Sequence, residues 1–111
     1  MTKVEYFRLE DSVMSPGKYF IRFDITLVPG IYTFGNYHIM GARLMNLSFA
    51  QYLRFCRDCV GGELIGKGTM YPMVVFNKTP ELVALVRLLN TRMNLVMMDR
   101  KGETDDNHNN P

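Results

Sequence analysis

The sequence contains no long apolar run. Its first residues already carry charges at Lys3, Glu5 and Arg8, which leaves no room there for the apolar core of a secretory signal. No window approaches the roughly 18 apolar residues that a membrane-spanning helix needs. We therefore expect a cytoplasmic protein, found in the host cytoplasm if a phage encodes it.

Cysteine and histidine are scarce. The chain has Cys56 and Cys59, His38 and His108, whereas a structural zinc site needs about four such ligands. A redox pair of cysteines normally begins a helix, where the helix dipole stabilises a thiolate, but this pair is expected to end one. We expect buried thiols, with a redox pair or a metal site as less favoured alternatives, and we expect no cofactor.

Motifs for catalysis are also missing. None of the serines lies in a G-x-S-x-G motif, which would mark a nucleophile. His38 stands alone in an expected strand, and Glu63 with Lys67 is better explained as a solvated pair than as an acid–base site. The sequence therefore predicts a protein that is not an enzyme.

The chain does contain enough apolar material for one domain, since 47% of its 111 residues are hydrophobic. Residues 103–111 carry three acidic residues and no Lys or Arg. Removing these three from the 11 acidic residues leaves 8 against 13 basic ones in residues 1–102, a net charge of +5. We expect a mildly basic α+β domain over residues 1–100 and a flexible, acidic, Asn-rich tail over residues 101–111.

Alternating side chains predict strands in the first 40 residues. Residues 3–9 mix aromatic and branched side chains with charges. Residues 18–28 place five apolar side chains on one face, namely Tyr19, Ile21, Phe23, Ile25 and Leu27. Gly35-Asn36 predicts a two-residue hairpin turn, with a bulge inside one long strand as the alternative. We expect an antiparallel meander without a helix here.

A helix is expected over residues 49–60. Ser48 and Gln51 form an S-x-x-Q capping box, and Gly61 suits a left-handed C-terminal cap. The expected core stripe consists of Phe49, Leu53, Cys56 and Val60. Arg54 and Asp58, four residues apart, are expected to face outward and to pair.

A second helix is expected to begin at Pro80, with Thr79 as its N-cap. The short apolar runs 72–76 and 95–98 predict two parallel strands, one before and one after this helix. The expected fold is therefore α+β: an antiparallel β-meander followed by helix, strand and helix. The two helices would pack on one face of the sheet, with residues 72–76 inserted centrally.

The stretch Gly61–Lys67 matches G-x-x-x-x-G-K, as in a phosphate-binding loop, but Gly68 replaces the required Ser or Thr. Such a loop follows a strand and begins a helix. This stretch instead follows a helix, at the negative end of its dipole, and precedes a strand. We expect a connection that holds Lys67 out between two glycines, and an enzyme acting on a phosphorylated substrate here is the least favoured interpretation.

The remaining signal is a basic surface without catalytic chemistry. We predict a small accessory protein, adaptor or inhibitor that binds a protein partner through a sheet edge or an exposed helix face. A phage or a mobile element is a compatible source, and a homo-oligomer formed through a sheet edge is an alternative. The candidate partner-contact residues are Arg54, Arg57, Gly66, Lys67, Gly68 and Lys78.

A nucleic-acid-binding module is the second hypothesis. Strand aromatics next to cations can stack unpaired bases. The aromatic residues concerned are Tyr6, Phe20, Tyr32, Phe34 and Tyr37, and the nearby cations are Lys18, Arg22 and Arg43. The expected order of elements differs from the β-α-β-β-α-β order of an RRM module, and most of these aromatics are expected in the core.

Overall fold

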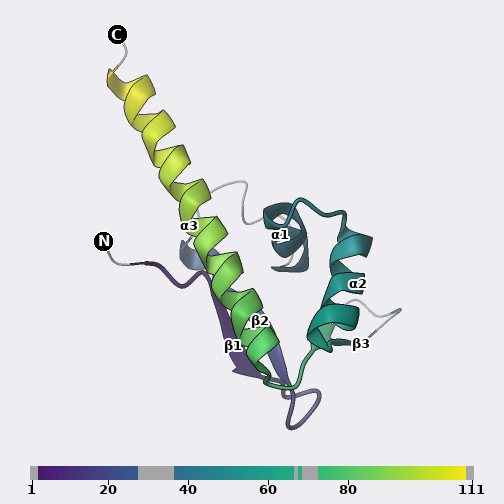
Figure 1. Cartoon of the computed structure of the whole chain (residues 1–111). Helices are drawn as coiled ribbons and strands as arrows, with labels where there is room; N and C mark the ends of the chain where they lie inside the picture. Colours follow the sequence, from purple (N-terminus) through teal and green to yellow (C-terminus); the bar gives the residue numbers. More distant parts are fainter. Residues whose placement is uncertain (1–2, 28–36, 67, 69–72, 110–111) are drawn as a thin grey trace.

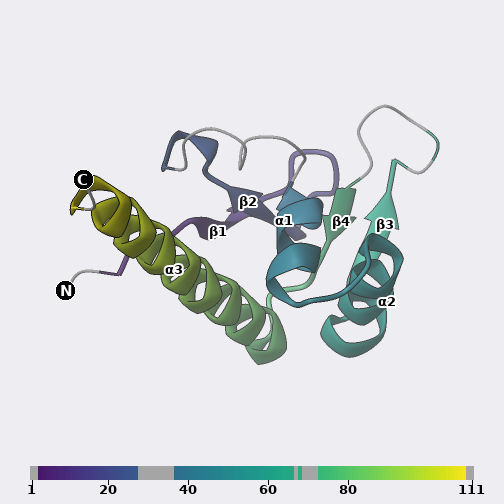
Figure 2. The same ribbon diagram turned by 90° about the horizontal axis from the view of Figure 1, so that it is seen from above.

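Two antiparallel hairpins and three α-helices make up the fold in the computed structural model, which describes residues 3–27, 37–66, 68 and 73–109. In Figure 2, the helices α2 (Phe49–Val60) and α3 (Pro80–Asn109) lie on the same side of the strands, and α1 (Tyr37–Leu44) lies between them. The α+β class is confirmed. The single meander is wrong, and three helices pack here instead of two.

The first hairpin joins β1 (Phe7–Asp11) to β2 (Tyr19–Phe23) in antiparallel pairing, with Phe7 opposite Phe23. The rings of these two residues lie 4.9 Å apart between centroids. Ile21 and Phe23 are buried while Arg22 is exposed, so the predicted alternation is confirmed over β2. This hairpin supplies part of the core below the helices.

Arginines face one another on the exposed side of this hairpin, because the register places Arg8 opposite Arg22. Each has an acidic partner: Arg22 Nε lies 2.7 Å from Glu10 Oε2, and Arg8 Nη2 lies 3.5 Å from Asp24 Oδ2. The pairs offset the repulsion between like charges on neighbouring strands. The outer face of this hairpin is therefore electrically balanced.

The predicted strand 18–28 ends early, at Phe23. Residues Ile25–Leu27 form a 3-10 helix, η1, because the Asp24 side chain accepts hydrogen bonds from both the backbone N–H and the hydroxyl of Thr26, at 3.0 and 2.6 Å. Side chains of this type compete with strand pairing. The hydrogen bond from the Thr26 hydroxyl also lowers the pKa of the Asp24 carboxyl.

The predicted absence of a helix in the first part of the chain is wrong, because Tyr37–Leu44 forms α1. The turn at Gly35-Asn36 lies outside the described residues. Gly41 allows α1 to pack closely on α2, since a Cβ at this position would lie 2.5 Å from the ring of Tyr52. The aromatic and branched residues of this stretch suggest a strand, whereas its contact with α2 requires a helix.

The helix α2 begins and ends where the sequence predicts. Ser48 and Gln51 form the capping box, with Gln51 N to Ser48 Oγ at 3.2 Å and Ser48 N to Gln51 Oε1 at 2.9 Å. Gly61 has the left-handed conformation, with φ of 75°. Local capping residues thus specify this helix.

The buried stripe of α2 differs from the predicted one. Tyr52, Cys56 and Val60 are buried, whereas Phe49 is exposed and Leu53 is only partly buried. The buried stripe is rotated relative to the predicted one because Tyr52 packs against Gly41 of α1. The sequence pattern of α2 alone does not predict this contact. As a result Leu53 faces the surface of the neighbouring hairpin.

The second hairpin pairs β3 (Glu63–Ile65) with β4 (Met73–Val75) in antiparallel fashion. The strand predicted at 72–76 is confirmed as β4, and β3 was not predicted. Tyr19 and Phe76 exchange two backbone hydrogen bonds of 2.8 Å each, which form an isolated bridge between the two hairpins. β4 therefore lies between β3 and the first hairpin.

The helix α3 begins as predicted, with the Thr79 hydroxyl accepting a hydrogen bond from Leu82 N at 3.2 Å. The strand predicted at 95–98 is wrong, because these residues continue α3. Neither Gly nor Pro interrupts the helical period there, and the buried side of α3 consists of Leu82, Leu85, Leu89 and Met93.

The end of α3 extends past the rest of the molecule (Figure 1), whose longest axis measures 54 Å. The helix runs on to Asn109, across the segment for which the sequence predicts a tail. The boundary at residue 100 and the flexibility of the segment after it stay predictions.

Candidate partner-binding groove

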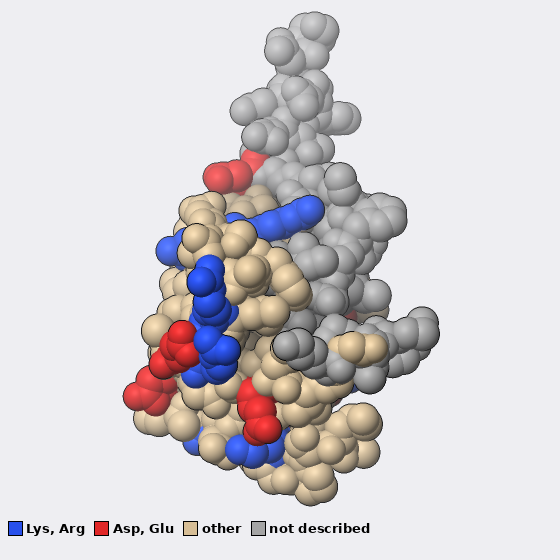
Figure 3. Space-filling view, turned by 90° about the vertical axis from the view of Figure 1, so that its right-hand side faces the viewer, with Lys and Arg blue, Asp and Glu red and all other residues tan. Residues whose placement is uncertain are grey.

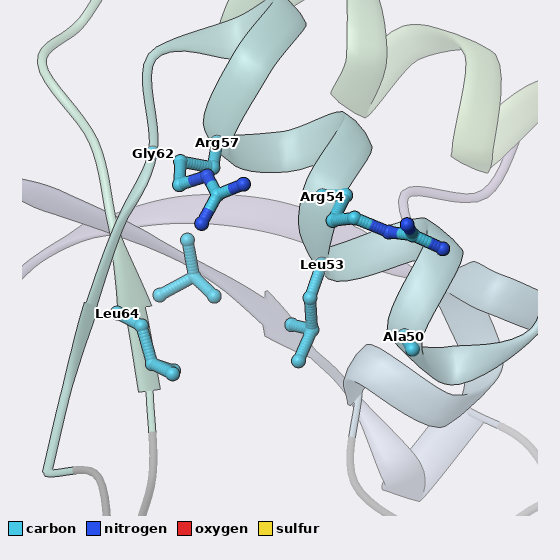
Figure 4. Close-up of a pocket in the computed structure, with 7 residues that line it drawn as sticks. Ala50, Leu53, Arg54, Arg57, Gly62 and Leu64 are labelled. Atoms are coloured by element: carbon cyan, nitrogen blue, oxygen red, sulfur yellow. The ribbon is translucent and has the colours of Figure 1, made fainter.

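A groove of about 250 Å³ lies between α2 and the second hairpin. Its walls come from one face of the helix and from one face of the hairpin. The lining residues are Ala50, Leu53, Arg54, Arg57, Gly62, Leu64 and Val74. In Figure 4, Leu53 and Leu64 project into the space between helix and strand.

Strand register builds the apolar wall of the groove. Leu64 on β3 lies opposite Val74 on β4, so both side chains point to the same face of the hairpin. Val74 is buried, while Leu64 remains 40% exposed and Leu53 partly buried. The groove therefore has a buried floor and accessible apolar sides.

Gly62 lets the chain pass close to the core beside the groove. Its N–H donates to Cys56 O at 2.8 Å, and a Cβ at this position would lie 2.7 Å from both the Phe76 ring and a Val74 methyl carbon. Such distances leave no space for a side chain. The glycine thus sets how near β3 lies to the end of α2.

Two arginines from α2 give the groove a positive rim. Arg57 Nε lies 3.0 Å from Asp58 Oδ1, and both side chains are more than half exposed. Asp58 pairs with this neighbour, so the predicted pair between Arg54 and Asp58 is wrong. Arg54 has no hydrogen bond or ion pair with any described residue. In Figure 3, which faces this side of the molecule, Lys and Arg side chains form a column with acidic side chains beside it.

The outer edge of β3 is unpaired within the described part of the chain. β3 pairs with β4 on one side, and no described strand lies along its other side. An unpaired edge presents backbone N–H and C=O groups that can pair with another strand. The open edge and the groove thus border the same strand.

The outer edge of β1, by contrast, is covered by side chains of α3. The Asn90 amide accepts from Phe7 N at 2.7 Å and donates to Phe7 O at 2.9 Å. Asn94 makes the same pair of contacts with Val4, at 3.2 and 2.8 Å. Each amide replaces the partner residue that a neighbouring strand would supply.

The structure brings together only some of the predicted contact residues. Arg54 and Arg57 both line the groove. Gly66 follows β3 directly, and both Gly66 and Gly68 have positive φ, of 70° and 84°. Lys67 lies outside the described residues.

Lys78 does not line the groove. Its Nζ lies 5.8 Å from the centroid of the Tyr19 ring, near the bridge between the hairpins, where Lys18 Nζ also reaches Asn77 Oδ1 at 3.0 Å. No described contact connects Lys78 with the two arginines, so its role as a contact residue stays a prediction.

The apolar residues of the groove were not predicted as part of a site. The sequence pattern places Leu53 in the expected core stripe of α2 and Leu64 in an expected connection. The alternation Glu-Leu-Ile between glycines was the one available signal for β3, but three residues are too few to establish a strand by pattern.

The two cysteines differ in environment. Burial raises the pKa of the Cys56 thiol to about 11, so this residue stays neutral near pH 7. Cys59 is a free, exposed thiol, which corrects the expectation that both would be buried. No group of three or more His, Cys, Asp or Glu residues suited to a metal ion occurs among the described residues.

The aromatic surface expected for nucleic acid is only partly visible. Tyr6 is buried, and Phe20 lies under the Arg22 guanidinium at 5.4 Å. Tyr32 and Phe34 lie outside the described residues, as does the side chain of Tyr37. The nucleic-acid hypothesis stays a prediction without a described stacking surface.

Comparisons with known proteins give no relative: no family model, curated protein or solved structure matches this chain. In the part of the chain that the structure describes, no helix has the length and apolar character that crossing a bilayer requires. The groove and its edge strand therefore have to be interpreted by their chemistry.

Proposed function

We propose that the protein is a non-enzymatic interaction protein that binds an extended peptide segment of a partner along the outer edge of β3. The observation that carries the proposal is the open edge of β3 beside an apolar groove with two arginines on its rim. Adding a strand to an exposed sheet edge is a common mode of peptide recognition.

The face of the hairpin that carries Leu64 determines which peptide residues matter. In an added strand, every second side chain would lie on this face and would enter the space beside α2. Leu53 and Leu64 would contact apolar side chains there. The peptide backbone supplies affinity, and the groove selects apolar residues at alternate positions.

The arginines on the rim favour a partner with carboxylates. Arg54 has no described partner, and the Arg57–Asp58 pair is exposed, so that exchanging Asp58 for another carboxylate costs little. A guanidinium can hold a carboxylate with two parallel hydrogen bonds. We therefore expect a segment that combines Asp or Glu with alternating apolar residues.

The test selects peptides from a random displayed library on the purified protein and measures their affinity by fluorescence anisotropy. Enriched peptides should combine acidic residues with alternating apolar ones. In an added strand, the N–H groups of every second peptide residue point toward β3, and those of the residues between them point away. N-methylation of the first set should therefore abolish binding, and N-methylation of the second set should not.

Matched variants then locate the site. Arg54→Glu and Leu64→Gln should each weaken binding about tenfold or more, while Lys3→Glu, an equal charge change at an exposed residue that lies beside α3 and does not line the groove, should not. Enriched peptides that bind all three variants alike would refute the proposal. Tight binding of single-stranded oligonucleotides, lost in Arg54→Glu and steeply weaker at higher salt, would favour the nucleic-acid hypothesis instead.

A further inference from the structure

The outer face of α3 carries an apolar stripe that the core does not use. Its members all lie on the side of the helix opposite the buried residues and are exposed. Leu88 is 37% exposed, Leu95 is 56% exposed and Met98 is 52% exposed. The full stripe, which we call the α3 seam, consists of four apolar residues and one threonine: Ala84, Leu88, Thr91, Leu95 and Met98.

The spacing of the α3 seam specifies what kind of element fits it. Successive members are separated by four, three, four and three residues, which is the 3.5-residue repeat of helices that pack side by side. A strand or an irregular peptide has no such period. The seam covers about two heptads, roughly 22 Å of helix at 1.5 Å per residue. It does not continue toward the N-terminus, because the next position of the repeat is occupied by the charged residue Glu81.

The residues beside the seam determine the charge of its partner. Arg87 directly precedes Leu88, and Arg92 directly follows Thr91, so one arginine flanks each side of the seam at the positions where paired helices exchange charges. Asp99, which directly follows Met98, is the one acidic residue at such a position in the described part of the seam. Arg87 and Arg92 have no ion pair with a described residue, and the Arg92 guanidinium donates to Leu44 O at 2.8 Å. Among the described residues, no carboxylate therefore lies within ion-pair distance of either guanidinium.

The same arginines disfavour a second copy of this chain. In a parallel pair, Arg87 of one copy would face Arg92 of the other. In an antiparallel pair centred on the seam, the two Arg92 side chains would lie close together. Like charges at these positions are unfavourable, whereas glutamates opposite both arginines would be attracted.

We propose that the α3 seam binds an amphipathic helix of another protein whose apolar side has the same 3-4 spacing and whose flanking positions are acidic. This site is independent of the β3 edge, because it lies on a different element and takes a helix in place of an extended segment. It gives the protein a second interaction surface.

The test uses two synthetic helical peptides of about three heptads, both with Ile and Leu at the seam positions. One has Glu at the flanking positions opposite Arg87 and Arg92, and the other has Lys at the same positions. We expect the Glu peptide to bind about tenfold or more tightly than the Lys peptide, as measured by anisotropy, and to gain helicity in circular dichroism. Binding of neither peptide, or equal binding of both, would overturn the proposal.

Three variants complete the test, each checked for folding by its thermal transition. Leu95→Gln should abolish binding of the Glu peptide, and Arg87→Glu should reduce the preference for Glu over Lys. Val13→Gln, at an apolar residue that is 92% exposed in the turn of the first hairpin, should change neither. A wild-type dimer in analytical ultracentrifugation that Leu95→Gln converts to a monomer would show a second copy on the seam and would also refute the proposal.

Discussion

The outermost strands of the two hairpins, β1 and β3, differ in how their outer edges are covered. Along β1 and the residues before it, Asn90 and Asn94 of α3 satisfy the backbone groups of Phe7 and Val4. Along β3, no described strand covers the edge. One outer edge is thus covered by side-chain amides, and the other edge has no described strand beside it.

The difference shows which strand edge is covered by side chains and which is not. Unpaired edges invite pairing with other chains, and proteins usually cover, shorten or charge them. β1 is protected by a helix that the core requires anyway, while β3 is only three residues long and carries one charge, at Glu63. A short edge limits unspecific pairing but remains available to a segment that also fits the groove.

The largest expected effect comes from uncovering the β1 edge. Asn90→Leu keeps the volume of the side chain but leaves the N–H and C=O of the buried Phe7 without partners, at a cost of about 3 kcal/mol in the free energy of unfolding. Urea unfolding measures this loss, and hydrogen exchange at the Phe7 amide should accelerate. Asn94→Leu, whose contacts with Val4 are exposed, should cost clearly less; equal losses would contradict the account.

Alkaline pH should weaken the opposite side of the molecule, through Cys56 of α2. The pKa of this thiol is raised from 9.0 to about 11 by burial, so its contribution to stability is fully present below pH 9 and is lost as the pH rises toward 11. The loss should reach about 2 kcal/mol by pH 11, out of roughly 3 kcal/mol for the full shift of two pKa units at about 1.4 kcal/mol each. The urea midpoint should fall between pH 8 and pH 11 in the wild type and in Cys59→Ala. An equally steep fall in Cys56→Ala would refute the assignment of this loss to the Cys56 thiol.

A methyl group at Gly62 should disturb the open edge directly. Gly62→Ala places a Cβ 2.7 Å from Phe76 and Val74, and overpacking of this kind costs about 1 to 2 kcal/mol. It should also weaken peptide binding at β3. Gly17→Ala, in the turn of the first hairpin, meets no atom within 4 Å and costs only left-handed backbone strain, about 1 kcal/mol. Peptide affinity that falls equally in both variants would argue against a local effect.

The smallest expected change in stability accompanies Leu64→Gln. Because this side chain is 40% exposed, the free energy of unfolding should change by only about 0.5 kcal/mol. The variant should nevertheless lose the selected peptides, which separates the groove from the core. A large loss of stability would mean that Leu64 serves the core instead.

The sequence predicts those parts of this fold that depend on local signals. The capping box of Ser48 and Gln51 gives the start of α2, Gly61 gives its end, and Thr79 with Pro80 gives the start of α3. Each of these residues acts on backbone groups within one helical turn. Short-range rules therefore suffice for them.

The remaining elements depend on contacts between distant residues. The helix α1 is stabilised by the approach of Gly41 to Tyr52, and the three-residue strand β3 by its pairing with β4. Residues 95–98 favour a strand by composition, but they continue a helix whose buried stripe begins at Leu82. Patterns within a short segment carry none of this information.

The candidate site divides in the same way. Arg54 and Arg57 are predictable because one helical turn separates two cations on an exposed face. The groove beside them is not, since it exists only when β3 and β4 pair and turn Leu64 toward Leu53. The asparagine contacts with Phe7 and Val4 connect residues that lie 83 and 90 positions apart in the sequence.

Asn90 and the α3 seam lie on the same helix. Binding at the seam is therefore thermodynamically linked to the covering of the β1 edge. A partner that binds α3 only in its helical, docked state lowers the population of states in which the helix has detached, by the factor 1 + [L]/Kd. Detachment of α3 is also what uncovers the Phe7 backbone. Occupancy of the seam would therefore be measurable at the β1 edge, as slower exchange of the Phe7 amide hydrogen, which the partner does not touch.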